Sequence, residues 1–382
     1  MKTRTSLGRR AVACGLAGVL AFSCVGGLAA CGSSASSSTS TESTTSTTET
    51  SEQLATTRTV TVDGTDYEIP AEVDKVAPTI GALAQVTMML SPTESKVAAA
   101  STQQITDRFK EVLSGYEEGN PSGYDTSDVE QVIESGAQVA YGPSAAYSDE
   151  QKQQLADAGV TFIPMDNITT VDGICDTTLA IGQILGGDAE TRAEDFVAYW
   201  KANTEDAENR TASLADDEKP TVLALGYSNG AWNTETGQTM ITSYIEAAGG
   251  VSLGKDYTAQ ESSGGGKGRG GATVDEEQIV AWNPDYIITY STDATDAIMS
   301  DAALADVTAV KEGHVYTSPQ GLYLWSVRSG EGAMMAPWIG TKIHPDLFAD
   351  VDMTQMVKDF FKDWYNYDLS DEDAAAVLNG TY

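Results

Sequence analysis

Aromatic side chains and one arginine follow the predicted strands of this 382-residue sequence, in loops of the kind that often carry binding residues. The guanidinium of Arg328 can hold a carboxylate or another oxygen anion through two parallel hydrogen bonds. Aromatic faces add apolar contact area and attract cations. The aromatic candidates are Tyr141, Tyr227, Trp232, Tyr290, Tyr323 and Trp325. Each ring either lines a ligand pocket or packs in the core, and Arg328 either binds a ligand or forms a structural salt bridge.

An internal repeat places two glutamates at matching positions. Residues 130–141 read EQVIESGAQVAY, and residues 277–290 read EQIVAWNPDYIITY. Each copy begins with Glu-Gln, continues as a short apolar helix, turns, and ends in a strand that finishes at a tyrosine. The glutamate stands seven residues before the turn position in both copies. The repeat therefore predicts that Glu130 and Glu277 occupy equivalent sites, one on each half of the molecule.

The two histidines do not form a metal-binding pattern. A bare transition metal normally needs several converging His, Asp or Glu ligands. His314 and His344 both lack a partner at ligand spacing. We expect His314 to end a turn before a strand and His344 to lie on the surface. The protein is therefore expected to hold no cofactor of its own, and any metal should arrive already chelated.

Residues 226–230, GYSNG, match the G-x-S-x-G pattern of a hydrolase nucleophile. A nucleophile elbow passes straight from a strand into a helix, whereas AWNTETGQ separates Gly230 from the next predicted helix. Neither histidine carries a signature that would mark it as the general base for Ser228. The sequence therefore argues against an enzyme.

The run GGGKGRGG at 264–271 carries Lys267 and Arg269, two cations in an acidic chain. It lacks the Walker spacing in which a lysine is followed by Ser or Thr, so it does not fit a phosphate cradle. Two interpretations stay open for this glycine loop: a lid over an anionic ligand, or a surface loop.

The N-terminal segment has the order of a lipoprotein signal. Four basic residues precede an apolar stretch from Ala11 to Ala30, which is typical of a secretory signal peptide. Small residues then precede Cys31, as in the bacterial lipobox. We expect residues 1–30 to be removed and Cys31 to carry a lipid anchor, with an uncleaved signal anchor as the alternative. Residues 31–57 are predicted to form a flexible Ser/Thr-rich linker.

The remaining chain is strongly acidic. Without the four basic residues of the signal, 18 Lys and Arg face 56 Asp and Glu. This charge repels nucleic acid, so we expect no nucleic acid partner. Cysteines 14, 24 and 31 lie in the export segment, which leaves Cys175 alone in the folded body. A lone thiol excludes an internal disulfide, and we expect Cys175 to be a small buried side chain.

Strand-like and helix-like segments alternate after the linker, which predicts an α/β architecture. We expect one α/β lobe over residues 58–170 and a second over residues 217–382, with the ligand cleft between them. Residues 171–216 carry a helical pattern that weakens only at Gly186-Gly187, and we predict that they form one long linking helix. The single elements that we predict include helices over residues 81–90, 127–135 and 149–158 and around 353–365, and strands over residues 96–99, 138–141 and 161–164.

Four stretches together resemble the substrate-binding proteins of ABC importers for iron-siderophores, haem and cobalamin. They are YEIP at 67–70, VDEEQIVAWNPDYII at 274–288, GLYLWSVRSGEGAMMAPW at 321–338, and the closing segment 343–378. The resemblance covers roughly residues 60–379. It implies two Rossmann-like α/β lobes joined by one long rigid helix. It also implies a lipid-anchored monomer outside the cytoplasm that delivers its ligand to a membrane permease with its ATPase.

The resemblance further implies a role for the repeated glutamates. In this family one glutamate at the top of each lobe docks on arginines of the permease, and Glu130 and Glu277 occupy the matching places; a solvated helix charge is the alternative for each. The expected ligand is a metal complex, namely a ferric siderophore, haem or a corrinoid. Within the same fold, an oxyanion such as molybdate or tungstate is the alternative. An adhesin and a surface hydrolase are the less favoured classes.

Overall fold

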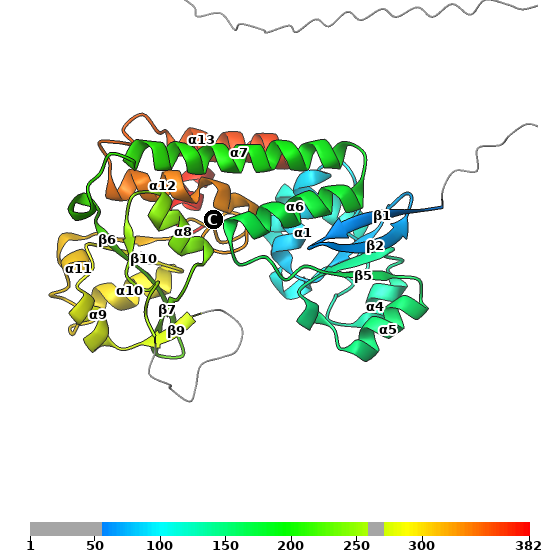
Figure 1. Ribbon diagram of the computed structural model, residues 1–382, viewed down its shortest axis with the longest axis horizontal. Coiled ribbons are helices and arrows are strands. Elements are labelled where there is room, and N and C mark those ends of the chain that lie inside the picture. The colour runs from blue at the N-terminus through cyan, green and yellow to red at the C-terminus, as the bar shows by residue number, and fades with distance from the viewer. Residues whose placement is uncertain (1–55, 259–270) are drawn as a thin grey trace, which may run out of the picture. The chain divides into compact units, whose positions relative to one another are not determined.

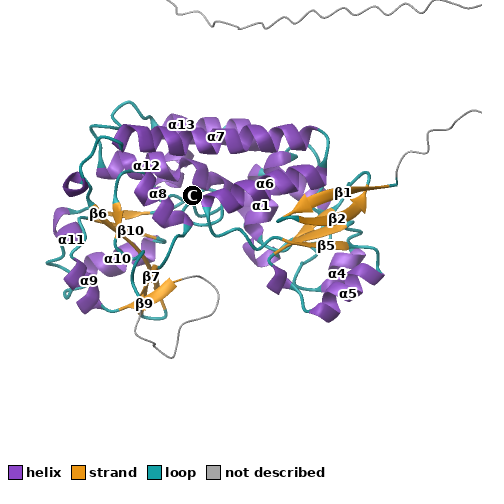
Figure 2. Cartoon of the chain, in the orientation of Figure 1, coloured by secondary structure: helices purple, strands orange, loops and turns teal. Residues whose placement is uncertain are grey.

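The computed structural model describes residues 56–258 and 271–382. Residues 54–382 form one compact unit, in which helices cover strands (Figures 1 and 2). The predicted signal peptide, Cys31 and the two cations of the glycine loop, Lys267 and Arg269, lie outside the described residues. Across the described part of the chain, no helix combines the length and apolarity that a membrane crossing requires.

The N-terminal part is built on a hairpin and a parallel sheet. Strands β1 (Thr57–Val62) and β2 (Thr65–Pro70) pair antiparallel across a two-residue Asp-Gly turn with positive φ at both residues. The parallel sheet has the order β3-β4-β5, with β3 at Val76–Pro78, β4 at Val139–Gly142 and β5 at Thr161–Pro164. The helices of this part are α1 (Gly81–Leu90), α2 (Asp107–Val112), α3 (Gly115–Gly119), α4 (Val129–Glu134) and α5 (Asp149–Asp157), with 3-10 turns η1 (Thr102–Gln104) and η2 (Ser144–Ala146).

The C-terminal part is built on a mixed sheet of order β11-β10-β6-β7-β9, with β8 paired to β6. Strand β10 runs parallel to both β6 and β11, whereas β7 runs antiparallel to β6 and β9. The strands are β6 (Thr221–Ser228), β7 (Ala231–Glu235), β8 (Val251–Ser252), β9 (Gly271–Val274), β10 (Tyr286–Thr289) and β11 (Val315–Thr317). The helices are α8 (Met240–Ala247), α9 (Glu276–Trp282), α10 (Thr292–Ser300), α11 (Thr308–Glu312), α12 (Met335–Ile343), α13 (Met353–Tyr365) and α14 (Asp371–Leu378), with 3-10 helices η3 (Asp216–Glu218) and η4 (Gly330–Met334).

The segment 171–216 contains two helices where we expected one continuous helix. Helix α6 (Val171–Leu185) ends at Gly186, and α7 (Asp188–Thr211) begins after Gly187. Both glycines have positive φ, a conformation that glycine adopts without steric cost, and α6 and α7 pack against each other. Helix α7 also contacts α1 of the N-terminal part and α8 and α12 of the C-terminal part. The glycine pair therefore ends a helix instead of merely weakening one.

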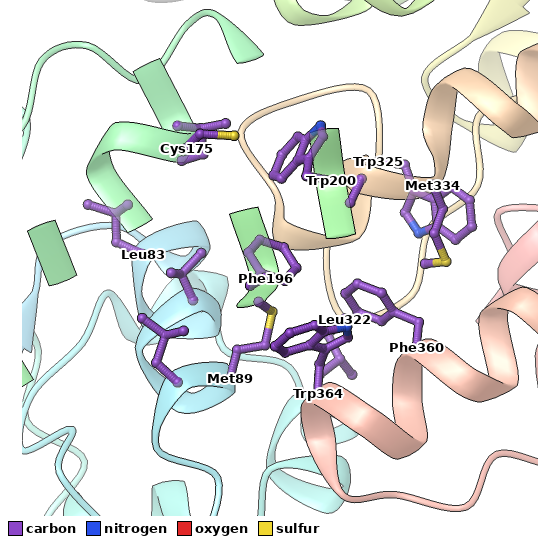
Figure 3. Packing of buried hydrophobic residues seen from close by; sticks show 14 of the residues in the cluster. Leu83, Met89, Cys175, Phe196, Trp200, Leu322, Trp325, Met334, Phe360 and Trp364 are labelled. Atoms are coloured by element: carbon purple, nitrogen blue, oxygen red, sulfur yellow. The ribbon is translucent and has the colours of Figure 1, made fainter. Parts of the chain in front are cut away.

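The largest hydrophobic cluster is continuous between the two parts. It includes side chains from β3, β4, α1, α6, α7, α8, α12 and α13. Figure 3 shows Met89 of α1, Phe196 of α7 and Trp364 of α13 gathered in it. The rings of Phe196 and Trp364 meet edge to face with their centroids 4.9 Å apart, the arrangement that aromatic quadrupoles favour. Two smaller clusters, one in each part, pack β6 and β10 against α9 to α11, and β4 against α4 and α5.

Cys175 of α6 belongs to this largest cluster, as the sequence predicted for a lone apolar thiol. Its side chain is free of a disulfide and the residue is 1% exposed. Burial raises the pKa of the Cys175 thiol to about 12, so the thiol stays protonated at neutral pH.

Candidate functional site

The two copies of the sequence repeat begin in the same way. Glu130 lies in α4 and Glu277 in α9, and each is the second residue of its helix. The residues before the helices, Asp128 and Asp275, are N-caps whose side chains accept hydrogen bonds from backbone N–H groups of the first turn. Both glutamates are exposed. The predicted equivalence of the two glutamates is therefore present in the local structure.

The two copies also end alike. Helix α4 is followed by Gly136 with φ of 74°, and α9 is followed by Asn283 with φ of 44°. Each of these turns leads into a strand with parallel neighbours on both sides, β4 between β3 and β5, and β10 between β6 and β11. In Figure 1, α4 and α9 both lie toward the lower edge of the view, while α7 lies along its top. The docking role of the two glutamates stays a prediction.

Arg328 lies in the loop between β11 and η4 and is half-buried. Within residues 56–258 and 271–382, no hydrogen bond, ion pair or ring contact engages its guanidinium. The structural salt bridge that we considered for Arg328 is therefore not formed within these residues. A partly desolvated cation without a counter-charge is unfavourable, and an anionic ligand would supply one.

Tyr323 and Tyr290 are half-buried, Tyr323 in the loop between β11 and η4 and Tyr290 directly after β10. The Cε2 atom of Tyr323 lies 3.3 Å from the position that a Cβ would take on Gly81, the first residue of α1. The Cδ2 atom of Tyr290 lies 3.2 Å from the corresponding position on Gly226 of β6. Glycine at both places lets a ring approach the backbone closely. Both tyrosines remain candidates for ligand contact.

Tyr227 and Trp232 form a pair across the β6–β7 hairpin. Their ring centroids lie 4.5 Å apart, and they are neighbours in the antiparallel register. Tyr227 is 41% exposed, whereas Trp232 is 5% exposed and belongs to a hydrophobic cluster. The Tyr227 ring is therefore accessible to solvent or to a ligand, and the buried Trp232 ring packs against it.

Tyr141 and Trp325 are core residues, so our prediction that they contact the ligand is corrected. Tyr141 is fully buried within β4, its hydroxyl is hydrogen-bonded to Thr87, and burial raises the pKa of its phenol well above the usual value. Trp325 is also fully buried, and its indole N–H donates to Glu331 over 2.9 Å. We expected the strand to finish at Tyr141, where the next loop begins, but β4 extends to Gly142 and is buried along its length.

Glu331 is a central residue that sequence reasoning missed. It is fully buried, and its carboxylate accepts five hydrogen bonds of 2.8–3.0 Å. The donors are the backbone N–H groups of Gly321 and Leu322, Trp325 Nε1, Gln85 Nε2 and the Tyr365 hydroxyl. Burial raises the pKa of Glu331 to about 7, although the hydrogen bonds act in the opposite direction. The one available signal was an acidic residue at the start of the apolar run GAMMAPW.

The GYSNG segment forms a β-hairpin. Ser228 ends β6, and Asn229-Gly230 form a two-residue turn into β7 with φ of 52° and 76°. Two positive φ values at an Asn-Gly pair are the signature of a hairpin turn whose twist matches the strands. The chain therefore returns as a strand after Ser228, whereas a nucleophile elbow continues into a helix.

Both histidines take part in structural contacts. The His314 ring stacks on Tyr286 with the centroids 4.6 Å apart, just before β11, as expected for a turn into a strand. His344 Nε2 lies 3.1 Å from the carbonyl oxygen of Gly249. Within the described part of the chain, no group of three or more His, Cys, Asp or Glu side chains is placed to hold a metal ion.

Two surface pockets lie away from the predicted site residues. One of about 520 Å³ is lined by β5 and α5, and includes Lys152 and Phe162. The other, of about 320 Å³, lies between α7 and α13 and includes Tyr199 and Trp364. Neither pocket is lined by a predicted ligand-binding or docking residue.

Comparison with known proteins agrees with the arrangement of sheets and helices. The family described as periplasmic binding protein matches residues 122–322, which is more than half of the chain. The chain belongs to the periplasmic binding protein family. Because this is a family of solute-binding proteins, the chain is a binding protein and not an enzyme, in agreement with the hairpin geometry at Ser228.

Three similar proteins illustrate this periplasmic binding protein's place in the family. A cobalamin-binding protein of Halobacterium salinarum is 26% identical over 66% of this chain and 64% of its own. A substrate-binding lipoprotein of an uncharacterised ABC transporter of Bacillus subtilis is 22% identical over 76% of this chain and 87% of its own. The crystal structure of a periplasmic solute binding protein from Veillonella parvula has a TM-score of 0.67 at 23% identity, over 85% of this chain and 97% of that chain. The chain spans less than two thirds of the first curated relatives that it matches.

Proposed function

We propose that this periplasmic binding protein is the lipid-anchored receptor of an ABC importer. It captures a small ligand outside the cytoplasm and delivers it to the membrane permease and its ATPase. The observation that carries the proposal is the pair of exposed glutamates, Glu130 and Glu277, at equivalent positions of two Asp-capped helices. Exposed carboxylates of this kind suit contacts with arginines of a permease, which set orientation and association rate more than affinity.

The ligand is proposed to be a metal chelate that presents negative oxygen groups, such as a ferric siderophore, haem or a corrinoid. Arg328 supplies a half-buried cation that lacks a protein partner within the described residues. Tyr227, Tyr290 and Tyr323 supply ring surface that is not sealed in the core. This combination of ring area and one cation suits an organic chelate, which presents apolar faces as well as negative oxygens. No resident cofactor is required, because the chelate carries its own metal.

An oxyanion such as molybdate or tungstate is the second candidate ligand. Arg328 would bind its oxygens equally well, because a guanidinium donates two parallel hydrogen bonds. An oxyanion would leave the three tyrosine rings without a role, however, and the chelate is preferred for that reason.

The lipid anchor is proposed from the N-terminal sequence, and the monomeric state from the resemblance to importer receptors. Cys31 is proposed to be the acylated N-terminus of the mature chain, with residues 31–57 as the tether. The protein then reaches the membrane through its lipid alone and acts as a monomer. The Bacillus subtilis relative, whose name describes a lipoprotein, supports this placement.

Thermal unfolding in the presence of haem, cobalamin, several ferric siderophores, molybdate and tungstate tests the ligand class. A ligand at about 100 times its dissociation constant stabilises the folded protein by about 2.7 kcal/mol. A bound chelate also leaves visible absorbance on the purified protein, whereas an oxyanion is colourless and is detected by elemental analysis. We expect a chelate to raise the Tm of wild type and to do so less in Arg328→Ala. Labelling of Ser228 by a fluorophosphonate probe would instead contradict the binding function.

A further inference from the structure

The loop of residues 321–330, which carries Arg328, rests on one stripe of helix α1. Gly81, Gln85 and Met89 are spaced four residues apart and therefore share one face of the helix. The Tyr323 ring lies against Gly81, as described above. At the other end of the loop, Gly330 N donates to Gln85 Oε1 over 3.1 Å, and a Cβ on Gly330 would lie 2.7 Å from Met89 Sδ.

The carboxylate of Glu331 is hydrogen-bonded to the start and the middle of the loop. It accepts hydrogen bonds from the backbone of Gly321 and Leu322, where the loop begins, and from the Trp325 indole near its middle. Glu331 itself follows the last residue of the loop. The loop is thus closed on itself by one buried side chain, and Arg328 lies between the Trp325 contact and the end of the loop.

Gln85 connects this closed loop to the N-terminal part. Its amide Nε2 donates to Glu331 Oε1 over 3.0 Å and to the Tyr365 hydroxyl over 2.7 Å. Its Oε1 accepts from Ser329 Oγ over 3.3 Å and from Gly330 N over 3.1 Å. Every one of these partners lies at least 244 residues away in the sequence. The side-chain amide of Gln85 therefore forms hydrogen bonds to the C-terminal part of the chain. These bonds join the two parts and do not stabilise α1 itself.

Within residues 56–258 and 271–382, three side chains donate hydrogen bonds to the Glu331 carboxylate. Gln85 faces it from α1, Tyr365 from α13, and Trp325 from the loop. Tyr365 is the titratable side chain among these three, and burial and the neighbouring carboxylate raise the pKa of its phenol well above the usual value. Tyr365 therefore remains a neutral donor, and Glu331 is the group in the cluster whose charge changes near neutral pH.

We propose that Gln85 and Glu331 are positioning residues that lock the loop 321–330 onto α1. The lock fixes Arg328 and Tyr323 relative to the N-terminal part of the ligand site, so that their positions are set before ligand arrives. A preorganised loop raises affinity because less conformational freedom is lost on binding. The role in ligand capture rests on the proposed function, whereas the lock itself is a property of the free protein.

Hydrogen exchange of the full chain tests the lock without any ligand. Wild type is compared with Glu331→Gln, Gln85→Leu and Thr87→Val. The Glu331→Gln change leaves one acceptor oxygen and places an N–H₂ group against the N–H donors, so part of the network is lost. Relative to the rest of the protein, we expect the amides of residues 321–330 to exchange at least tenfold faster in Glu331→Gln and Gln85→Leu.

Thr87→Val is the matched control. Thr87 lies on the same helix and is fully buried, but its hydroxyl contacts the Leu83 carbonyl and the Tyr141 hydroxyl instead of the loop. Its loss removes a buried polar pair and leaves the loop contacts intact. We expect faster exchange around α1 and β4 in this variant, with residues 321–330 as protected as in wild type.

The exchanged pair Gln85→Glu with Glu331→Gln supplies the rescue. It moves the acid to α1 and the amide to the loop, and so restores an acceptor opposite a donor. Because the amide at position 331 still places N–H groups against donors of the loop, we expect loop protection to recover in part. The proposal is overturned if the amides of residues 321–330 exchange hydrogen no faster in Glu331→Gln and Gln85→Leu than in Thr87→Val. It is also overturned if the double variant protects these amides no better than the two single variants do.

Ligand binding provides the functional readout. For whichever of haem, cobalamin or the ferric siderophores binds wild type, Glu331→Gln should weaken binding about tenfold, mainly through faster dissociation, and Thr87→Val should not. An unchanged dissociation constant in Glu331→Gln would overturn the positioning role. If wild type binds none of these probes, the proposed chelate function fails, while the exchange experiment still decides whether the lock exists.

Discussion

Glu130 and Glu277 hold the same place in two helices 147 residues apart, each two residues after an aspartate N-cap. A carboxylate in the first turn interacts favourably with the positive end of the helix dipole, so a glutamate suits this position in both helices. Their caps use the neighbouring aspartates, which leaves the glutamate side chains exposed. The two residues therefore present negative charges that no ion pair engages within the part of the chain that the structure describes.

Replacement of both glutamates should impair delivery and spare ligand capture. In Glu130→Ala with Glu277→Ala, we expect the rate of association with the permease to fall about tenfold at low salt, because exposed charges act mainly on encounter and contribute about 0–1 kcal/mol each. Ligand affinity and Tm should stay at wild-type values. Uptake of the ligand into vesicles that contain the importer is the measurement.

The control for this experiment uses exposed acids on the same two helices. Glu134 of α4 and Glu276 of α9 are both exposed, and their replacement by glutamine removes the same net charge. We expect near wild-type uptake from this control pair. Equal loss of uptake in both double variants would mean that overall charge, and not the position of Glu130 and Glu277, governs docking.

Arg328→Ala should weaken ligand binding without destabilising the protein. Hydrogen bonds to a charged group contribute about 1.5–3 kcal/mol, so we expect the dissociation constant of an anionic ligand to rise about 10- to 100-fold. Because no partner engages Arg328 within the described residues, the free energy of unfolding of the ligand-free variant should change by less than about 0.5 kcal/mol. Isothermal titration and urea unfolding measure the two quantities.

Arg108→Ala is a suitable comparison for the arginine change. Arg108 is also half-buried, but it pairs with Glu111 and lies over the Tyr382 ring. Arg108→Ala removes one positive charge, as Arg328→Ala does. Ligand affinity should nevertheless stay unchanged in Arg108→Ala. If Arg328→Ala instead lowered stability and left affinity unaltered, Arg328 would have a structural role.

Much of the local structure follows from the sequence pattern alone. The predicted helices over residues 81–90 and 353–365 and the strand over residues 161–164 have these same bounds in the structure. The repeat also identified two matching helix starts, because capping residues and short apolar runs are local features. Local chemistry therefore located the two glutamates correctly on exposed first turns.

The ligand candidates were less predictable because their exposure depends on distant segments. Tyr141 and Tyr290 close the two repeats in the same way, yet Tyr141 is fully buried and Tyr290 is not. Glu331 was missed because its partner Gln85 is 246 residues away and only the tertiary fold brings the two together. Periodicity shows which face of an element is apolar but not which element covers it.

Glu331 should make stability depend on pH in a direction opposite to that of an ordinary paired carboxylate. Burial raises the pKa of the folded-state carboxyl from its usual 4.5 to about 7, so the folded protein binds this proton more tightly than the unfolded chain does. The resulting stability is fully present below pH 4.5 and is lost as the pH rises through 7. The loss is at most about 3 kcal/mol, because one pKa unit corresponds to about 1.4 kcal/mol.

Urea unfolding at pH 5 and pH 8 measures this dependence, with Glu331→Gln as the comparison. The neutral amide cannot titrate, so the difference between the two pH values should shrink by the contribution of Glu331. Other groups contribute to both proteins alike and cancel. An identical pH dependence in wild type and Glu331→Gln would show that the carboxylate has an ordinary pKa in the folded protein.

Gly186→Ala tests whether the chain reverses between α6 and α7. Gly186 has φ of 71° and ψ of 179°, a conformation that is essentially restricted to glycine, so alanine should cost about 1–3 kcal/mol of the free energy of unfolding. Gly115→Ala in α3 is the control, because the nearest atom to an added Cβ lies 3.4 Å away at both glycines and only Gly186 has positive φ. One continuous helix would make the opposite prediction: alanine at position 186 would then stabilise the protein by about 1 kcal/mol. Urea unfolding of the two variants therefore distinguishes a helical hairpin from a single linking helix by the sign of the change.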